Sequence, residues 1–312
     1  MLSLTAKGTP ASGPLAALAR ARASSSGTTW MNTGLSPCAA MRRYTSSIMA
    51  KLYRGMDRAA LDAAYNNGTA VKESARIVAD WQARSERIRA KYPDGLDLRY
   101  GPAERNRIDF FEARKDSPLL VFIHGGYWQN RAKELFAFLV PGPLAHGISV
   151  ALVGYTLAPE KRLDGIVGEI RTAIQYLDSR GNRMIVSGWS AGGHLAAMAL
   201  QMPAVNAGLL ISGLYDLEPI RHSYINDKLG LDAMEADRNS PISMPAYSEP
   251  VAIAYGANEL PELRRQSEEY AKKVKQAKLL RLAGHDHFSI LEELASPGGA
   301  LTAAVRGLVD GL

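Results

Sequence analysis

The chain has 312 residues, 46% of them hydrophobic, which is enough to bury the core of one or two domains, and no run of 18 or more apolar residues predicts a membrane span. Its formal net charge of +6 comes from the first 56 residues, which hold seven basic residues and no acidic one; the other 30 basic and 31 acidic residues give −1. This nearly neutral body excludes the broad basic surface that nucleic-acid binding requires, and a single cysteine, Cys38, excludes an internal disulfide.

Residues 1–50 are rich in Ser, Ala, Thr, Gly and Arg with little hydrophobic period, so we expect a disordered segment outside the fold. An acid-free composition rich in Arg and Ser is typical of an organelle transit peptide. The alternative, which we favour, is a misassigned start ahead of a true start at Met49 or Met56. We therefore expect a cytoplasmic protein, or an organelle-targeted one if the segment is a genuine transit peptide.

Residues 51–312 are expected to form a single domain whose first part, residues 57–92, is a small helical cap. The clearest helical pattern in this cap is VKESARIVADWQARSERIRAKY, which Pro93 ends. Its apolar positions recur near the helical period at Val71, Ala75, Val78, Ala79, Ile88 and Tyr92.

After the cap, short apolar stretches alternate with helical patterns. Strands are predicted at residues 97–101, 107–113, 119–126, 149–155, 183–189, 207–215, 250–256 and 277–284. Helices are predicted at residues 131–145, 163–179, 191–201, 261–276 and 288–308. This alternation predicts an α/β fold with a mainly parallel eight-stranded sheet and helices on both of its faces.

The stretch VFIHGGYW, residues 121–128, places two glycines directly after a buried strand. Lipases and esterases use such a loop as an oxyanion hole, because glycine lets backbone N–H groups approach a tetrahedral oxyanion. We expect Gly125 and Gly126 to supply donors and His124 to make a structural hydrogen bond. The aromatic residues beside the glycines and the nucleophile either stack on an aryl ring of a substrate or belong to the core: Tyr127, Trp128 and Trp189.

The stretch GWSAG, residues 188–192, matches the G-x-S-x-G pattern of a nucleophile elbow. A buried strand precedes it and a helical pattern follows it, which is the strand–turn–helix context that the motif requires. The sequence therefore predicts Ser190 as a nucleophile and the N–H of Ala191 as a further oxyanion donor at the start of a helix. The alternative is a strand–helix turn without chemistry.

The elbow pattern places the acid and then the histidine after the serine in the chain. We favour His287 over His285, because it begins HFSILEEL, a loop that enters a helix after the last strand. The acid is expected at Glu259, in the loop after the preceding strand, where it would orient His287. Asp216 is the rival and follows an earlier strand, while a solvated surface side chain is the other interpretation of Glu259.

Taken together, HGGYW, GWSAGGHL, SGLYDLEPI, GANELPELRRQS and HDHFSILEEL resemble the serine-dependent arylformamidases (kynurenine formamidases), which are related to the hormone-sensitive-lipase-like α/β-hydrolases. The resemblance runs from about residue 57 to the C-terminus. It implies an α/β-hydrolase fold with Ser190 as nucleophile, His287 as base and Glu259 at the position of the acid, which is usually Asp in the family. It also implies hydrolysis of N-formyl-L-kynurenine or a similar aryl formamide through a formyl-serine intermediate.

Three other hypotheses stay open at this point. The first is a carboxylesterase that cleaves small acyl esters with the same triad. The second, a metal-dependent formamidase with HDH at 285–287 as ligands, is disfavoured because no further ligand cluster, HExxH or paired CxxC accompanies it. The third is a non-enzymatic binding member of the fold. We expect no cofactor, no metal and a small-molecule partner, and the sequence leaves open whether the chain forms a homodimer.

Overall fold

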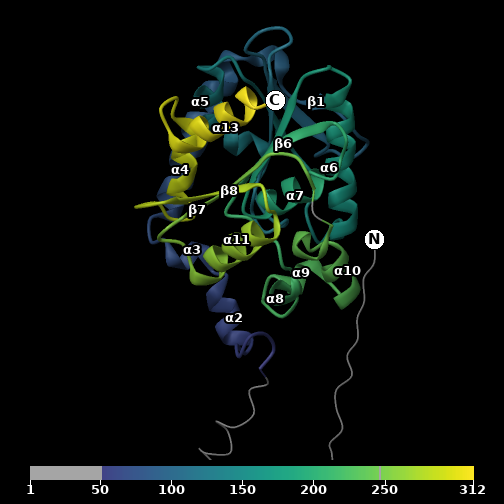
Figure 1. The fold of residues 1–312 in the computed structure, drawn as a ribbon, viewed down its shortest axis with the longest axis vertical. Coiled ribbons are helices and arrows are strands. Elements are labelled where there is room, and N and C mark those ends of the chain that lie inside the picture. Colours follow the sequence, from purple (N-terminus) through teal and green to yellow (C-terminus); the bar gives the residue numbers. More distant parts are fainter. Residues whose placement is uncertain (1–50, 246) are drawn as a thin grey trace, which may run out of the picture. The chain divides into compact units, whose positions relative to one another are not determined.

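A central sheet organises the computed structural model, which describes residues 51–245 and 247–312 (Figure 1). The expectations for residues 1–50 lie outside the described residues. The strands follow the order β1-β2-β4-β3-β5-β6-β7-β8, which confirms the predicted eight-stranded sheet. They are β1 (Leu98–Arg99), β2 (Arg107–Phe111), β3 (Leu119–Ile123), β4 (Ser149–Val153), β5 (Met184–Trp189), β6 (Val205–Ile211), β7 (Val251–Gly256) and β8 (Ala277–Leu282).

The sheet is mainly parallel. Strand β2 pairs antiparallel with both β1 and β4, and all pairs from β4 to β8 are parallel. Every residue of β3, β4 and β5 is buried, as expected for strands that are covered on both faces. The carboxyl ends of these parallel strands meet at one edge, which is where open α/β sheets place their ligands.

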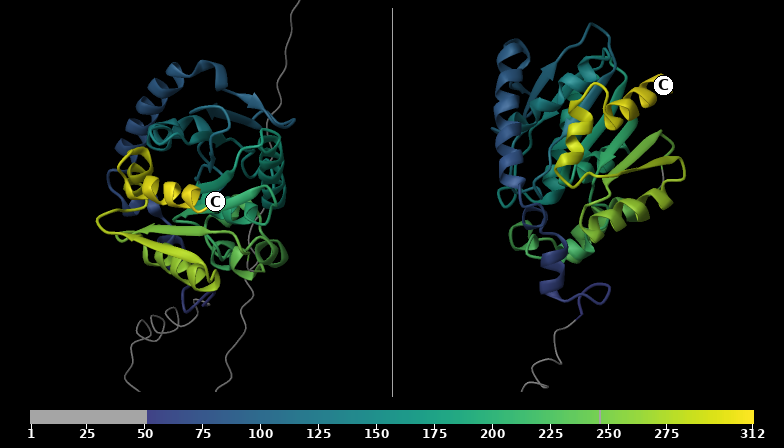
Figure 2. Two further views of the ribbon diagram at one scale, coloured as in Figure 1. Left: turned by 45° about the horizontal axis from the view of Figure 1, so that its top comes forward. Right: turned by 90° about the vertical axis from the view of Figure 1, so that its left-hand side faces the viewer.

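Helices cover both faces of the sheet (Figure 2). Helices α6, α7 and α11 share one apolar core with one face, and α4, η2, α12 and α13 share a second core with the other. The α-helices are α2 (Arg58–Ala64), α3 (Asn67–Ala70), α4 (Ser74–Lys91), α5 (Pro141–Leu144), α6 (Leu163–Asp178), α7 (Ala191–Ala199), α8 (Glu218–Arg221), α9 (Asn226–Leu229), α10 (Ala233–Arg238), α11 (Pro261–Lys273), α12 (Glu292–Ala295) and α13 (Ala300–Asp310). The 3-10 helices are η1 (Pro93–Gly95), η2 (Lys133–Leu139), η3 (Pro241–Ser243) and η4 (Ser289–Leu291).

Two predicted helices are divided in the structure. Residues 131–145 form η2 and the short α5, because prolines at 141 and 143 lack the N–H groups that a continuous helix needs. Residues 288–308 form η4, α12 and α13, with a Ser-Pro-Gly-Gly turn between the last two. The short helices α8, α9 and α10 were not predicted, because they have no sustained hydrophobic period.

Helix α4 buries only part of the predicted face. Val78 and Ile88 pack against the second core, as predicted. Ala75, Ala79 and Tyr92 are exposed, whereas Trp81 and Ser85 are buried against η2. The Ser85 hydroxyl donates to the Leu135 carbonyl at 2.8 Å, and the indole of Trp81 stacks within the aromatic core under the sheet. The helix therefore turns its large aromatic residue inward and leaves its small alanines outside.

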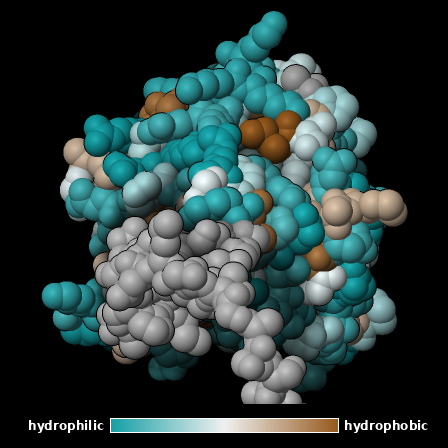
Figure 3. Space-filling view, turned by 90° about the horizontal axis from the view of Figure 1, so that it is seen from below, coloured by the Kyte–Doolittle hydropathy of each residue, from teal (hydrophilic) through white to brown (hydrophobic). Residues whose placement is uncertain are grey.

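No helix in the described part of the chain is both long and apolar enough to cross a bilayer. The face in Figure 3 is mostly hydrophilic where it is described, and its hydrophobic residues lie in separate spots.

Candidate active site

Ser190 lies on a sharp turn between β5 and α7. Its backbone has φ 58° and ψ −121°, a left-handed conformation that is unfavourable for a residue with a side chain. Its N–H donates to the Ile211 carbonyl at 2.9 Å, which holds the turn against β6. The helix also approaches β3 closely, since a Cβ on Gly192 would lie 2.0 Å from the Ile123 carbonyl oxygen. Only glycine at 192 permits this approach, so the small residues of the motif build the turn.

The glycine loop after β3 lies against this turn. A Cβ on Gly125 would lie 3.0 Å from the Cβ of Ser190 and 2.6 Å from the Trp189 carbonyl oxygen. The N–H groups of Gly125, Gly126 and Ala191 donate to no acceptor in the described ranges. They are therefore free donors next to the serine, and the N-terminus of α7 adds positive potential there.

His124 holds the orientation of the glycine loop. Its Nδ1–H donates to the Gly125 carbonyl at 2.8 Å, and its ring stacks on Tyr155 with centroids 4.2 Å apart. In a trans peptide the N–H of Gly126 then points away from the imidazole. Burial lowers the pKa of His124 to about 3, so the ring is neutral at physiological pH.

His287 and Glu259 meet where the loops after β8 and β7 come together. The Nδ1 of His287 lies 2.9 Å from Oε2 of Glu259, and both side chains are buried. The other carboxylate oxygen, Oε1, accepts from the Ser212 hydroxyl and from the Gly256 N–H, each at 2.6 Å. The carboxylate is thus held from three sides, and it selects the imidazole tautomer with the proton on Nδ1.

Ser190 and His287 line the same cavity, which has a volume of about 420 Å³. No hydrogen bond joins these two described side chains, and catalytic hydrogen bonds are often long before a substrate binds. The cavity is lined by Asn66, Asn67, Gly68, Gly126, Tyr127, Asn130, Arg131, Trp189, Ser190, Tyr224, His287 and Phe288. It brings together the predicted serine, the predicted histidine and part of the glycine loop.

The rival histidine His285, the buried His194 and the rival acid lie elsewhere. His285 contacts Glu293 at 3.2 Å and does not line the cavity. His194 is buried between the Trp128 indole and the Asn239 carbonyl, and burial lowers its pKa to about 4. Asp216 accepts from the Tyr53 hydroxyl at 2.5 Å and from the N–H of Glu218. Through the second bond the Asp216 carboxylate caps the segment that follows it.

The HDH stretch at 285–287 does not converge on one point, because His285 and His287 contact different carboxylates. Among residues 51–245 and 247–312, no three His, Cys, Asp or Glu side chains are grouped as metal ligands.

The aromatic residues proposed for stacking on a substrate differ in position. Trp128 is fully buried and lies outside the cavity lining, and its indole N–H donates to Nδ1 of His194 at 3.2 Å. The assignment of Trp128 to the substrate is therefore corrected to a core role, since the ring has no free face. Tyr127 and Trp189 do line the cavity, although only 2% of Trp189 is exposed.

Several lining residues were not predicted from the sequence. Asn67 on α3 donates to the Tyr127 hydroxyl at 3.0 Å and so joins the N-terminal cap to the glycine loop. Tyr224 comes from the segment between α8 and α9, and Arg131 follows the glycine loop. Only Arg131 has a recognisable signal, namely a basic residue just after an oxyanion-hole motif.

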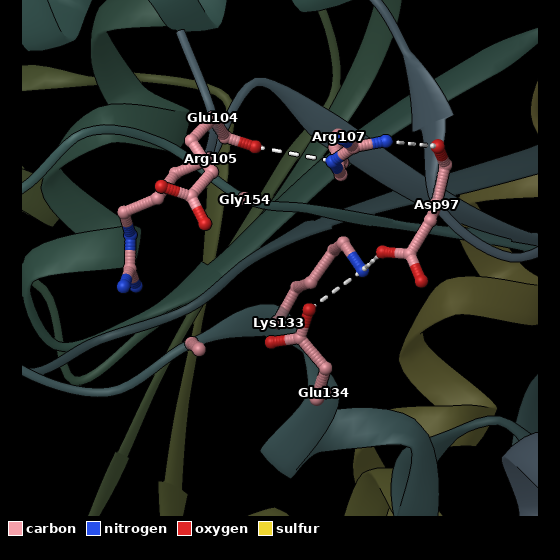
Figure 4. A pocket seen from close by; sticks show the side chains of 8 residues that line it. Asp97, Glu104, Arg105, Arg107, Lys133, Glu134 and Gly154 are labelled. Carbon is pink, nitrogen blue, oxygen red and sulfur yellow. Dashed lines mark hydrogen bonds and ion pairs between the residues drawn. The ribbon is translucent and has the colours of Figure 1, made fainter.

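A second cavity, of about 400 Å³, is lined by charged side chains around Lys133 (Figure 4). The ammonium of Lys133 donates to Asp97, Asp109 and Glu134 at 2.6–2.8 Å. Burial lowers the pKa of Lys133, but these carboxylates raise it by more, so the net shift is upward. This cavity contains no serine–histidine pair, and its charges neutralise one another.

Comparison with known proteins gives consistent results. The profile of the BD-FAE family matches residues 110–283. The chain is 34% identical to the kynurenine formamidase of Danio rerio over 258 residues, which cover 74% of this chain and 87% of that protein. The crystal structure of a "putative thioesterase" from Silicibacter sp. TM1040 is 31% identical, with a TM-score of 0.75, and the match covers 79% of this chain and 98% of that one.

An esterase from Pyrobaculum calidifontis superimposes with a TM-score of 0.60 at 20% identity, over 76% of this chain and 93% of that one. Because the identity is low, this likeness concerns the fold alone. Together with the sheet topology it confirms the predicted fold class.

Proposed function

The chain belongs to the kynurenine formamidase family of α/β-hydrolases and is a hydrolase, and on this premise we propose that it cleaves the formamide of N-formyl-L-kynurenine or a similar aryl formamide. The observation that carries the proposal is the hydrogen bond of 2.9 Å between His287 and Glu259 at the cavity that also contains Ser190. The order of these residues along the chain is that of the family's nucleophile, acid and base.

In the first half of the reaction, Oγ of Ser190 attacks the formyl carbon and its proton passes to Nε2 of His287. Glu259 stabilises the imidazolium that forms. The negative oxygen of the tetrahedral intermediate accepts from the N–H groups of Gly125, Gly126 and Ala191, and such a donor typically contributes about 100-fold to 1,000-fold in turnover. His287 then gives its proton to the aryl nitrogen, the C–N bond breaks, and the aryl amine leaves.

In the second half, a water molecule attacks the formyl-serine ester while His287 takes one of its protons. The second tetrahedral intermediate collapses, formate leaves, and the proton returns from His287 to Ser190. The balance is one amide and one water consumed and one amine and one formic acid released, which ionises to formate and a proton, with no oxidant or reductant.

Glutamate in place of the family's usual aspartate is accommodated by the surrounding loop. The longer side chain of Glu259 is held at 2.6 Å by the Gly256 N–H at the end of β7 and at 2.6 Å by the Ser212 hydroxyl, which follows β6. These two donors support its role as the acid that orients His287.

The deciding experiment compares specific activity on N-formyl-L-kynurenine and on p-nitrophenyl acetate, with formate measured directly. Formate release that is lost in Ser190→Ala supports the proposal. Activity on the ester without activity on the formamide would identify a carboxylesterase with the same triad. No turnover of either substrate with retained ligand binding would point to a binding member of the fold.

A further inference from the structure

Arg131 follows the glycine loop of the candidate active site and has an unusual backbone conformation. It lies five residues after Gly126, lines the cavity of Ser190 and His287, and has a left-handed backbone with φ 75°. Arginine has no preference for this conformation, which is unfavourable at a non-glycine residue. Its backbone carbonyl accepts from the Arg105 guanidinium, so a second arginine helps to hold the turn.

Among the described residues, the guanidinium of Arg131 has no partner of opposite charge. In the described part of the chain it makes no hydrogen bond and no ion pair with any side chain. It lies over the rings of Trp189 and Phe288, 5.5 and 5.7 Å from their centroids. Burial lowers the pKa of Arg131, and no carboxylate offsets the effect.

The unpaired charge of Arg131 contrasts with that of a nearby buried cation. Lys133, two residues further on, is neutralised by three carboxylates. A partly buried charge without a partner is unfavourable, and proteins normally pair it. The side chain of Arg131 is therefore poised for a partner that the protein does not supply.

The cavity itself favours an anion. No Asp or Glu is among the described residues that line it, and Glu259 is occupied by His287. The guanidinium lies over Trp189 and Phe288, and none of its N–H groups donates to a described residue, so they are available to a ligand. Free parallel N–H groups match the two oxygens of a carboxylate.

We propose that Arg131 binds the carboxylate of an aromatic amino-acid substrate and selects aryl formamides that carry a carboxylate over those that lack one. The inference rests on the proposed function and adds the group that holds the far end of the substrate. With the carboxylate on Arg131, the formyl group can lie at Ser190 within the same cavity of about 420 Å³, a volume suited to a small aromatic ligand.

The experiment compares two matched substrates, N-formyl-L-kynurenine and 2′-formamidoacetophenone, which keeps the aryl formamide and lacks the amino-acid end. In Arg131→Met, the ratio of kcat/KM between the substrate with the carboxylate and the substrate without it should fall about 10-fold to 100-fold, mainly through KM. Methionine keeps the length and the packing on the two rings. Arg131→Lys keeps the charge and should restore part of the ratio.

Arg180→Met is the matched control. Its guanidinium also lies over an aromatic ring, that of Phe110 at 4.2 Å, and it is outside the catalytic cavity. Its substrate ratio should equal that of the unmodified chain. Thermal unfolding of all variants separates loss of fold from loss of selectivity.

A second pair of substrates separates failure of this inference from failure of the proposed function. It consists of the acetate esters of 3-(2-hydroxyphenyl)propionate and of the corresponding neutral amide. If formamides are not cleaved but Arg131→Met still lowers the anionic-to-neutral ratio on the esters, the carboxylate site stands and the formamidase activity fails. An unchanged ratio in Arg131→Met, or equal losses on both members of a pair, would show that Arg131 only packs on the rings.

Discussion

The indole N–H of Trp189 donates to the backbone carbonyl of His287 across 2.7 Å, and the two rings lie 4.8 Å apart. Trp189 directly precedes Ser190 in the chain. One side chain at the end of β5 therefore ties the loop of the proposed base to the turn of the proposed nucleophile. The ring that sequence reasoning offered for substrate stacking contributes chiefly to the position of the histidine.

This relationship predicts the effect of Trp189→Phe. The aromatic packing is largely kept, but the His287 carbonyl loses its buried donor, which costs about 1–3 kcal/mol of unfolding free energy. Because the loop of the base loosens, kcat should fall about 10-fold or more while KM changes less. Steady-state kinetics and chemical denaturation measure the two effects.

Trp128→Phe is the control for that change. It removes an indole donor of the same kind, to His194, outside the cavity. It should destabilise the fold by a similar amount with a smaller effect on kcat. Equal kinetic losses in the two variants would contradict a specific role for the contact between Trp189 and His287.

The next prediction concerns the nucleophile and the base as a unit. Ser190→Ala and His287→Ala should each lower kcat by roughly 10,000-fold or more, and the double variant should lose little further. His285→Ala should be mild, because its ring contacts Glu293 and lies outside the cavity lining. A deeper loss in His285→Ala than in His287→Ala would reverse the choice between the two histidines.

The buried histidine His194 predicts a pH dependence of stability. Burial lowers its pKa in the folded state to about 4, below the ordinary value of 6.5, so the unfolded chain binds the extra proton first. The stability from the neutral ring is present above pH 6.5 and is lost as the pH falls toward 4. From pH 7 to 5 the loss is about 2 kcal/mol for this one group.

His194→Gln tests that dependence, because the amide nitrogen of Gln can still donate to the Asn239 carbonyl, as Nε2 of His194 does. Denaturant unfolding between pH 7 and 5 should show a shallower fall in free energy for the variant than for the unmodified chain. Identical slopes would mean that His194 contributes nothing to the acid sensitivity.

Sequence reasoning succeeded where residues are constrained by the backbone. The strands from β3 to β8 are short apolar runs, and the glycines beside Ser190 are required by close approaches of the chain, so both leave a readable pattern. The orientation of neighbouring aromatic residues, in contrast, leaves no readable pattern in the sequence. Tyr127 and Trp128 both have left-handed φ values, 51° and 58°, which turn the chain so that one lines the cavity and the other enters the core.

Residues that reach the cavity from distant segments were also beyond prediction. Asn67 and Tyr224 come from short helices and loops whose residues have no hydrophobic period, and only the packing of the cap places them near Ser190. The inward face of α4 was predicted only in part for a related reason. Ala75 and Trp81 both lie three residues from Val78, and the stacking of Trp81 on Phe138 of η2 decides which of them is buried.

The assignment of the acid is tested by changing Glu259 and Asp216 in parallel. Glu259→Gln keeps the shape but removes the charge and favours the wrong imidazole tautomer, a change that costs about 10,000-fold in a related triad. Glu259→Asp should lose less, since it keeps the charge with a longer gap to His287. Asp216→Asn should be mild in turnover, because the Asn carbonyl oxygen can still accept from the Glu218 N–H while its amide N–H donates to the Tyr53 hydroxyl oxygen, the two partners of the Asp216 side chain in the structure. Turnover of the three variants on one substrate decides the matter: a severe loss in Asp216→Asn beside a nearly normal Glu259→Gln would move the acid to the loop after β6.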